Sequence, residues 1–98
     1  MTARLSLDGE VLRVEGHIDA GNADAVCAEG ERLLAGQPVS RIDLAALASA
    51  STLVVAVLLR WARAAAAGGR TLQLANVPEK CRAIIAVSGL TEAFGLAA

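Results

Sequence analysis

The chain has few aromatic residues, no excess of charge and no long apolar run. Its 98 residues include Trp61 and Phe94 but no tyrosine, so it lacks the aromatic side chains on which nucleic-acid bases stack. The formal net charge is -1, whereas DNA binding needs concentrated positive charge. The longest apolar run, 53–59, ends at Arg60 and is far shorter than the roughly 20 residues that span a bilayer. Nucleic-acid binding and membrane insertion are therefore both disfavoured.

Metal, disulfide and nucleotide chemistry also lack their usual sequence patterns. Cys27 and Cys81 lie 54 positions apart, His17 is the only histidine, and no CxxC motif occurs. Zinc sites and disulfide frameworks need closer or more numerous ligands, and phosphate-binding loops need glycine patterns such as GxGxxG, which the chain does not have. The first residues show no signal-peptide pattern, so we expect a cytoplasmic protein with reduced cysteines. From the missing ligand and glycine patterns we expect neither a metal nor a cofactor.

The composition that is present is that of one globular domain. Hydrophobic side chains make up 55% of the chain and charged ones 19%, which is unlike a disordered sequence. A chain of this length has room for one core, so residues 1–98 are assigned to a single domain. Residues 41–82 carry six basic and two acidic side chains, a bias that could face an acidic partner.

The hydrophobic pattern predicts an α/β domain with the element order ββαβαβα. Apolar and polar residues alternate on both sides of Asp8-Gly9, which is a hairpin signal, and helical spacing begins after Asp19. Strands joined through helices pair in parallel, so we expect a small mixed four-stranded sheet with the third strand inside it. The predicted strands cover 4–7, 11–18, 39–44 and 71–75, and the predicted helices cover 19–36, 53–67 and 78–89.

Capping residues mark the ends of these helices. Asp19 or Asn22 can cap the first helix, and Gly68-Gly69 ends the second. Pro78 suits the first position of the third helix, and Gly89 is its expected C-cap. One face of this third helix carries Cys81, Ile84, Ile85 and Ser88.

The helix over 53–67 has an outer face that could bind a partner. At 100° per residue, one face must pack on the sheet; it carries Val54, Val57, Leu58, Trp61 and Ala65. The opposite face begins at a hydroxyl and is mixed apolar and basic; it carries Thr52, Ala56, Arg60, Arg63 and Ala67, with Val55 and Leu59 beside them. Exposed apolar side chains beside arginines are typical of protein interfaces. The simpler interpretation is a solvated face with Thr52 as the N-cap.

Catalysis has little support in the sequence. Thr52 is a poor nucleophile candidate, because His17 is the only histidine and no Asp, Glu or Lys lies between Leu44 and Gly69 to act as a base. Asp43 follows a predicted strand, but a single carboxylate is usually a cap or a surface charge. Thr52 could instead accept a phosphate, because a helix N-terminus offers free N–H groups.

Three segments in this order resemble the STAS domain over nearly the whole chain: GHIDAGNADAV, RIDLAALASASTLVVAVLLRWARAAAAGGRTLQLANVP and SGLTEAFGL. In that family a strand ending in Asp-Leu leads to an Asp-Ser/Thr helix start, and Gly-Leu and a late apolar residue follow the last helix. The matching positions here are Asp43-Leu44, Ser51-Thr52, Gly89-Leu90 and Phe94.

Within the family, the residues 58–61 (LLRW) and 76–78 (NVP) are most similar to MlaB-like members. The resemblance implies a non-catalytic subunit that docks on the ATPase of an Mla-type phospholipid-transport ABC complex, peripheral at the inner membrane through that partner. It also implies that Thr52 engages the ATPase. Together with the outer helix face, the candidate partner-binding residues are Thr52, Ser51, Val55, Ala56, Leu59, Arg60 and Arg63.

The family also contains anti-sigma factor antagonists, which provide the alternative function. Thr52 matches the position phosphorylated in those proteins, so Ser51 and Thr52 are candidate phosphorylation sites for a partner serine kinase. Ser51 replaces the usual Asp, and Leu53 and Val54 replace small glycine positions, which disfavours kinase-regulated switching. A small ligand-binding or enzymatic domain is a third hypothesis.

Overall fold

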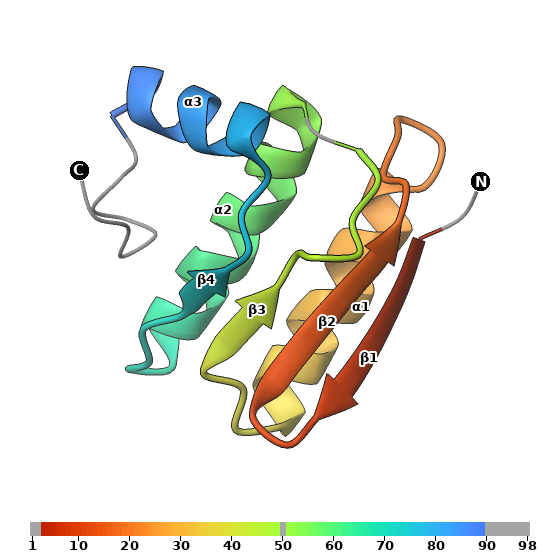
Figure 1. Ribbon diagram of the computed structural model, residues 1–98. Helices are drawn as coiled ribbons and strands as arrows, with labels where there is room; N and C mark the ends of the chain where they lie inside the picture. The colour runs from red at the N-terminus through yellow and green to blue at the C-terminus, as the bar shows by residue number, and fades with distance from the viewer. Residues whose placement is uncertain (1–2, 50, 90–98) are drawn as a thin grey trace.

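The computed structural model describes residues 3–49 and 51–89, which form a four-stranded sheet packed against helices (Figure 1). Within these residues the element order is ββαβαβα, as predicted. The strands are β1 (Ala3–Asp8), β2 (Val11–Gly16), β3 (Arg41–Asp43) and β4 (Gln73–Ala75), and the helices are α1 (Ala23–Gly36), α2 (Thr52–Ala67) and α3 (Glu79–Val87). The chain is therefore a small α/β domain.

The sheet is mixed and its strands lie in the order β1-β2-β3-β4. β1 and β2 are antiparallel, and the turn between them holds Gly9 at φ +62°, a left-handed value that glycine adopts without a steric penalty. β3 pairs in parallel with β2 on one side and with β4 on the other. This confirms the predicted hairpin and the predicted place of the third strand inside the sheet.

β3 and β4 are shorter than the sequence predicts. Each has three residues, whereas the apolar patterns extend over 39–44 and 71–75. Val39, Leu44 and Leu72 lie outside the strands but are buried. The core therefore reaches beyond the hydrogen-bonded ladder, and an apolar pattern shows burial more reliably than it shows where a ladder ends.

The contact between α1 and α2 depends on one glycine. Trp61 of α2 is fully buried, and its indole Nε1 donates a hydrogen bond of 3.0 Å to the backbone oxygen of Cys27. A Cβ atom on Gly30 of α1 would overlap with the indole ring of Trp61. The missing side chain at Gly30 therefore lets α1 lie directly against the tryptophan.

The start of α1 is organised by a loop rather than by a side-chain cap. Asn22 occupies the N-cap position but makes no capping hydrogen bond. Its side chain instead accepts from the N–H of Asp19 (2.9 Å) and donates to the backbone oxygen of His17 (2.8 Å), while the Asp19 carboxylate accepts from the N–H groups of Gly21 and Asn22. Asp19 and Asn22, the predicted capping residues, therefore form hydrogen bonds within the turn that precedes α1. Asn22 does not cap the helix with its side chain.

α3 begins at Glu79, and Pro78 occupies the N-cap position. The prediction that Pro78 is the first helical residue is wrong by one position. The C-cap of α3 is Ser88, one residue before the predicted Gly89. Gly89 follows it with a left-handed φ of +72°, and its N–H donates to the oxygen of Ala86. Ser88, predicted on the same face as Cys81 and Ile85, is exposed, whereas those two residues are buried. No helix in the described part of the chain is both long enough and apolar enough to cross a membrane.

Candidate protein-docking site

The two faces of α2 largely follow the helical spacing. The side chains predicted to face the sheet are all buried: Val54, Val57, Leu58, Trp61 and Ala65. The exposed side chains on the opposite face include four of the predicted partner-binding residues: Thr52, Ala56, Arg60 and Arg63. The hydroxyl and basic parts of the predicted surface are therefore accessible.

Val55 and Leu59 do not form the exposed apolar part of this surface. Only 4% of Val55 is exposed, and Leu59 is partly buried against the core. The prediction that they are exposed is wrong because it treats the sheet as the only structure that covers α2. In the structure α2 contacts both α1 and α3 (Figure 1), so a wider arc of its surface is buried.

Arg60 is accessible but joined to α1. Its guanidinium lies 3.0 Å from the Glu31 carboxylate, and the two side chains are 56% and 33% exposed. Ion pairs this exposed contribute about 0–1 kcal/mol to stability. Arg60 can therefore leave Glu31 for an acidic group of a partner at little cost.

Ser51 and Thr52, the candidate phosphorylation sites, have different roles at the start of α2. Ser51 is the N-cap, and its Oγ accepts a hydrogen bond of 3.4 Å from the N–H of Val54. Thr52 is the first helical residue and is exposed. The interpretation of Thr52 as the N-cap is wrong because the helix begins one residue earlier than its apolar run. Thr52 is the more accessible of the two hydroxyls.

The loop before α2 is held to the sheet. The buried Ser49 hydroxyl accepts a hydrogen bond of 3.0 Å from the N–H of Ile18, and Leu47 bridges to Gly16 at the end of β2. Polar groups that are buried and satisfied in this way make a loop rigid. Leu47 and Ser49 are therefore anchored beside the end of β2, a few residues before Thr52.

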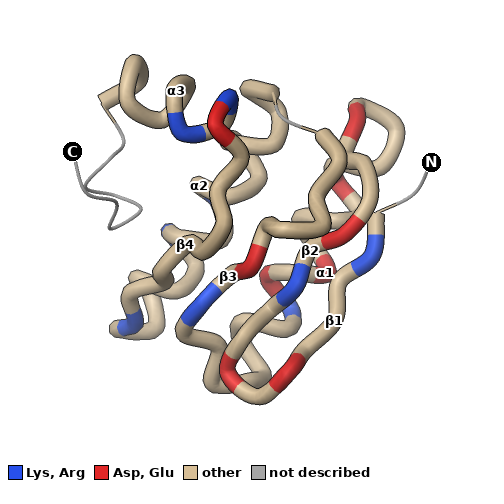
Figure 2. Tube along the Cα trace, viewed as in Figure 1, with Lys and Arg blue, Asp and Glu red and all other residues tan. Residues whose placement is uncertain are grey.

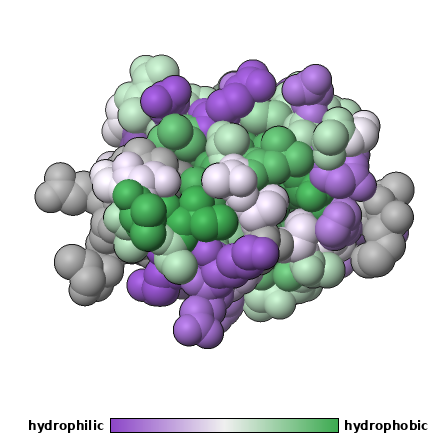
Figure 3. Space-filling model, turned by 90° about the horizontal axis from the view of Figure 1, so that it is seen from above, coloured by the Kyte–Doolittle hydropathy of each residue, from purple (hydrophilic) through white to green (hydrophobic). Residues whose placement is uncertain are grey.

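An apolar groove lies between Thr52 and α3. It has a volume of about 350 Å³ and is lined by Thr52, Lys80, Ala83, Ile84, Val87 and Ser88. Val87 is 90% exposed, so it extends the apolar surface of the groove outward. Viewed from the side of α3, the surface shows apolar patches bordered by polar side chains (Figure 3).

The sequence does not predict the α3 wall of this groove. Ile84 shares its predicted helix face with Cys81 and Ile85, which are buried, yet its side chain is half-buried and lines the groove. The available signal was Val87, which follows Ile84 by three positions at the end of an amphipathic helix. The charged residues of α3 lie in its first turns, at Glu79, Lys80 and Arg82 (Figure 2), so the later part of the helix is uncharged.

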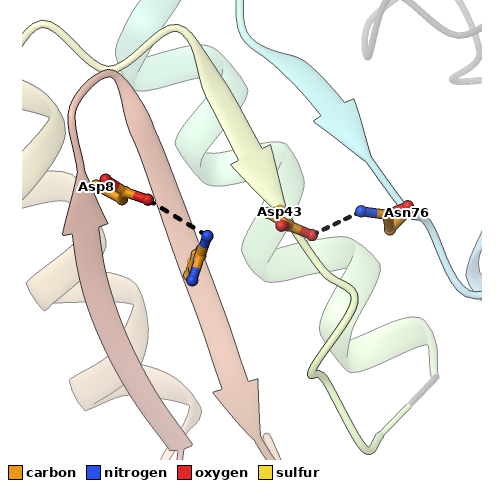
Figure 4. A network of polar contacts seen from close by, with 4 residues as sticks. Asp8, Asp43 and Asn76 are labelled. Carbon is orange, nitrogen blue, oxygen red and sulfur yellow. Dashed lines mark hydrogen bonds and ion pairs between the residues drawn. The ribbon is translucent and has the colours of Figure 1, made fainter.

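Asp43 takes part in a structural brace between strands. Its Oδ1 accepts a hydrogen bond of 3.0 Å from Asn76 Nδ2 (Figure 4). The same oxygen accepts a hydrogen bond of 2.9 Å from the N–H of Ala45. Both bonds lower the pKa of the Asp43 carboxyl, and the bond from Asn76 has the larger effect. The carboxylate thus links the end of β3 to the residue after β4, as expected for a capping charge.

The described thiols are suited to packing rather than to catalysis. Burial raises the pKa of both Cys27 and Cys81; Arg60 partly offsets the effect at Cys27, and the Ser51 backbone does so at Cys81. A raised pKa keeps a thiol protonated and unreactive. Among residues 3–49 and 51–89, no three His, Cys, Asp or Glu side chains are grouped so that they could hold a metal ion.

Comparison with known proteins identifies related sequences and folds. A family model described as "Mlab, STAS domain" matches residues 1–97. The anti-sigma factor antagonist SpoIIAA in its unphosphorylated form has a TM-score of 0.71 at 20% identity, covering 93% of this chain and 84% of that chain. The phosphorylated form of the Bacillus cell fate determinant SpoIIAA has a TM-score of 0.69 at 19% identity, with coverages of 93% and 86%.

A third solved structure, of an anti-sigma factor antagonist from Mycobacterium paratuberculosis, has a TM-score of 0.64 at 20% identity and covers 97% of this chain and 83% of that chain. No curated protein sequence matches the chain. The TM-scores establish a common fold, and at identities this low the likeness carries no function. The predicted fold class is confirmed.

Proposed function

The chain belongs to the MlaB-like STAS domain family, and we propose that it is a non-catalytic subunit that binds the ATPase of an Mla-type phospholipid-transport ABC complex. The observation that carries this proposal is the exposed Thr52 hydroxyl beside an apolar groove whose rim residue Val87 is 90% exposed. In this role the domain supports the assembly or activity of the ATPase. It stays in the cytoplasm, peripheral at the inner membrane through its partner.

Apolar burial would supply most of the affinity at this site. Burying an exposed valine side chain is worth about 1.5–3 kcal/mol, and Val87 and Ile84 both present apolar surface to the groove. An apolar side chain of the ATPase would fill the groove, while Lys80 at its border would pair with a carboxylate. Interfaces of this kind have an apolar centre and a polar rim.

Thr52 would determine the specificity of docking. Its side chain stands at the first position of α2, beside the groove, where it can exchange hydrogen bonds with the partner. Arg60 and Arg63, exposed further along α2, would lie at the rim of the interface, with Ala56 between them and Thr52. Ser51 would act indirectly, by capping the helix that presents Thr52.

The test is co-purification of the tagged chain with its cellular partners, followed by mass spectrometry. We expect an ABC ATPase and its permease. Val87→Asp and Thr52→Asp should each weaken ATPase binding by about tenfold or more. Ala86→Asp is the matched control, because Ala86 is exposed on the same helix but does not line the groove.

Two results would contradict the proposal in different ways. If both groove variants bind the ATPase as well as Ala86→Asp does, docking uses another surface. If no ATPase co-purifies with the unaltered chain, the transporter role itself is wrong. Circular dichroism of each variant checks that the fold is retained.

The alternative is an anti-sigma factor antagonist controlled by phosphorylation. Its support is the exposed hydroxyl of Thr52 at a helix N-terminus, where a phosphate would meet free N–H groups. Ser51 is less suited to modification because its oxygen already caps α2. Recovery of a kinase-like anti-sigma factor, with phosphate on Thr52 or Ser51, would replace the transporter proposal with this one.

A further inference from the structure

The outer edge of β1 is an open strand edge within the described residues. β1 has six residues and pairs with β2 on one side only, and it lies at the opposite end of the sheet from β4 (Figure 1). The edge strand β4 has only three residues. A long edge with free N–H and C=O groups can template pairing with another strand.

The turn after Asp8 determines which backbone groups point outward. In a hairpin with a two-residue turn the closing pair is hydrogen-bonded, and such pairs alternate with non-hydrogen-bonded pairs along the ladder. The closing pair here is Asp8 with Val11, and the register is unbroken back to Ala3. Leu5 and Leu7 therefore direct their N–H and C=O groups away from β2. The strand contains no proline, so these donors are all present.

The side chains of β1 divide between the two faces of the sheet. Leu5 and Leu7 stand opposite the buried Val14 and Leu12 and so lie on the face that the helices cover. Leu7 is 37% exposed. The alternate residues lie on the other face and include two exposed charges, Arg4 and Asp8.

We propose that β1 pairs antiparallel with β1 of a second copy of this chain. The two-fold axis passes between the Ser6 residues of the two copies. In this register Arg4 faces Asp8 of the second copy, and Asp8 faces its Arg4. Leu5 of each copy lies opposite Leu7 of the other copy. The outward N–H and C=O groups of these leucines form the ladder between the copies. Opposite charges and apolar pairs placed directly across two strands both stabilise a sheet.

Other registers of β1 against itself are less favourable. A shift by one residue places the outward N–H and C=O groups of one strand opposite residues of the other copy. The N–H and C=O groups of those residues already bond to β2. A shift by two residues keeps the ladder, but it places Arg4 opposite Ser6 in one direction and Asp8 opposite Ser6 in the other, so the Arg4–Asp8 pairs are lost. The ion pair that Asp8 makes with Arg13 within one chain is 3.3 Å long with both side chains more than half exposed (Figure 4), which leaves the carboxylate available.

The dimer joins two sheets into one and keeps both grooves accessible. α3, which forms one wall of the groove, lies toward the β4 side of the domain, away from β1 (Figure 1). A partner that carries two docking sites would then bind with higher effective affinity. One strand pair buries little area compared with a stable dimer interface, so the association is weak and depends on concentration and salt.

Charge reversal tests this register in the full chain. Sedimentation equilibrium over a wide concentration range should show a monomer–dimer equilibrium. Arg4→Asp alone and Asp8→Arg alone should each weaken it about tenfold, because two attractive cross-strand pairs become repulsive. An equimolar mixture of the two variants should form a heterodimer, and the double variant Arg4→Asp/Asp8→Arg should dimerise again.

The proposal is overturned if the unaltered chain stays monomeric, if single reversals leave dimerisation unchanged, or if the mixture fails to associate. Formation of the heterodimer also shows that both variants are folded. Hydrogen exchange gives an independent measurement: the amides of Leu5 and Leu7 should become protected as concentration rises, whereas the amide of Ser6 is protected at every concentration. Unchanged exchange at Leu5 and Leu7 would contradict the pairing.

Discussion

The two flanks of α2 are packed in different ways. On the side of α1, the bare backbone at Gly30 lies against the fully buried Trp61, and an ion pair joins the helices at the surface. On the side of α3, Cys81 and Ile85 are buried, yet Thr52 and Val87 border an open groove. Close packing uses apolar surface for stability, whereas looser packing leaves apolar surface that a partner can cover. The same helix thus has a structural flank toward α1 and an open flank toward α3.

The largest effect is expected at the centre of the structural flank. Trp61→Ala should lower the free energy of unfolding by about 3–5 kcal/mol, because it leaves a large cavity and removes the hydrogen bond to the Cys27 oxygen. Urea denaturation followed by circular dichroism measures the change. A loss below about 1 kcal/mol would show that α1 and α2 collapse around the missing ring.

Adding one carbon to the same contact should also destabilise the fold. Gly30→Ala is expected to cost about 2 kcal/mol through overpacking against Trp61, although alanine favours helix formation by about 1 kcal/mol. The control is the same change in a Trp61→Leu background, where the smaller side chain makes room. Equal penalties in the two backgrounds would contradict the proposed contact.

Two valines compare a buried position of α2 with the rim of the open groove. Val55→Ala should lower the free energy of unfolding by about 1.5 kcal/mol because Val55 is buried. Val87→Ala should change it by less than about 0.5 kcal/mol because that side chain is 90% exposed. Similar losses for both variants would mean that Val87 is covered in solution.

The smallest effect concerns the brace away from both flanks. The pKa of Asp43 is lowered below its ordinary value of 3.8, so the ionised carboxylate stabilises the fold above that value, and this contribution is lost as pH falls through the folded pKa. Asn76→Gly removes the side-chain donor and suits the left-handed φ of +55° at this position. The Asp43 pKa, followed by NMR, should then move up toward 3.8; an unchanged pKa would exclude Asn76 as the main cause.

Much of the fold could be predicted from local sequence signals, and less of the site could be. Glycine and proline marked the turns and helix ends, and periodicity identified the buried face of α2. The exposure of Thr52, Arg60 and Arg63 followed from the same spacing. Val55 could not be placed in this way, because its burial depends on which helices lie beside α2 rather than on its own helix.

The sequence by itself determined the element order, the opening hairpin and the candidate hydroxyl at Thr52, because turn chemistry and hydrophobic period act over a few residues. Only the tertiary structure decided that Val55 is buried and that Val87 stands at the rim of a groove. Those outcomes depend on which elements pack against α2. That packing is determined by contacts between residues that are far apart in the sequence. Local pattern shows that a face is apolar, whereas the neighbouring elements decide how much of it remains exposed.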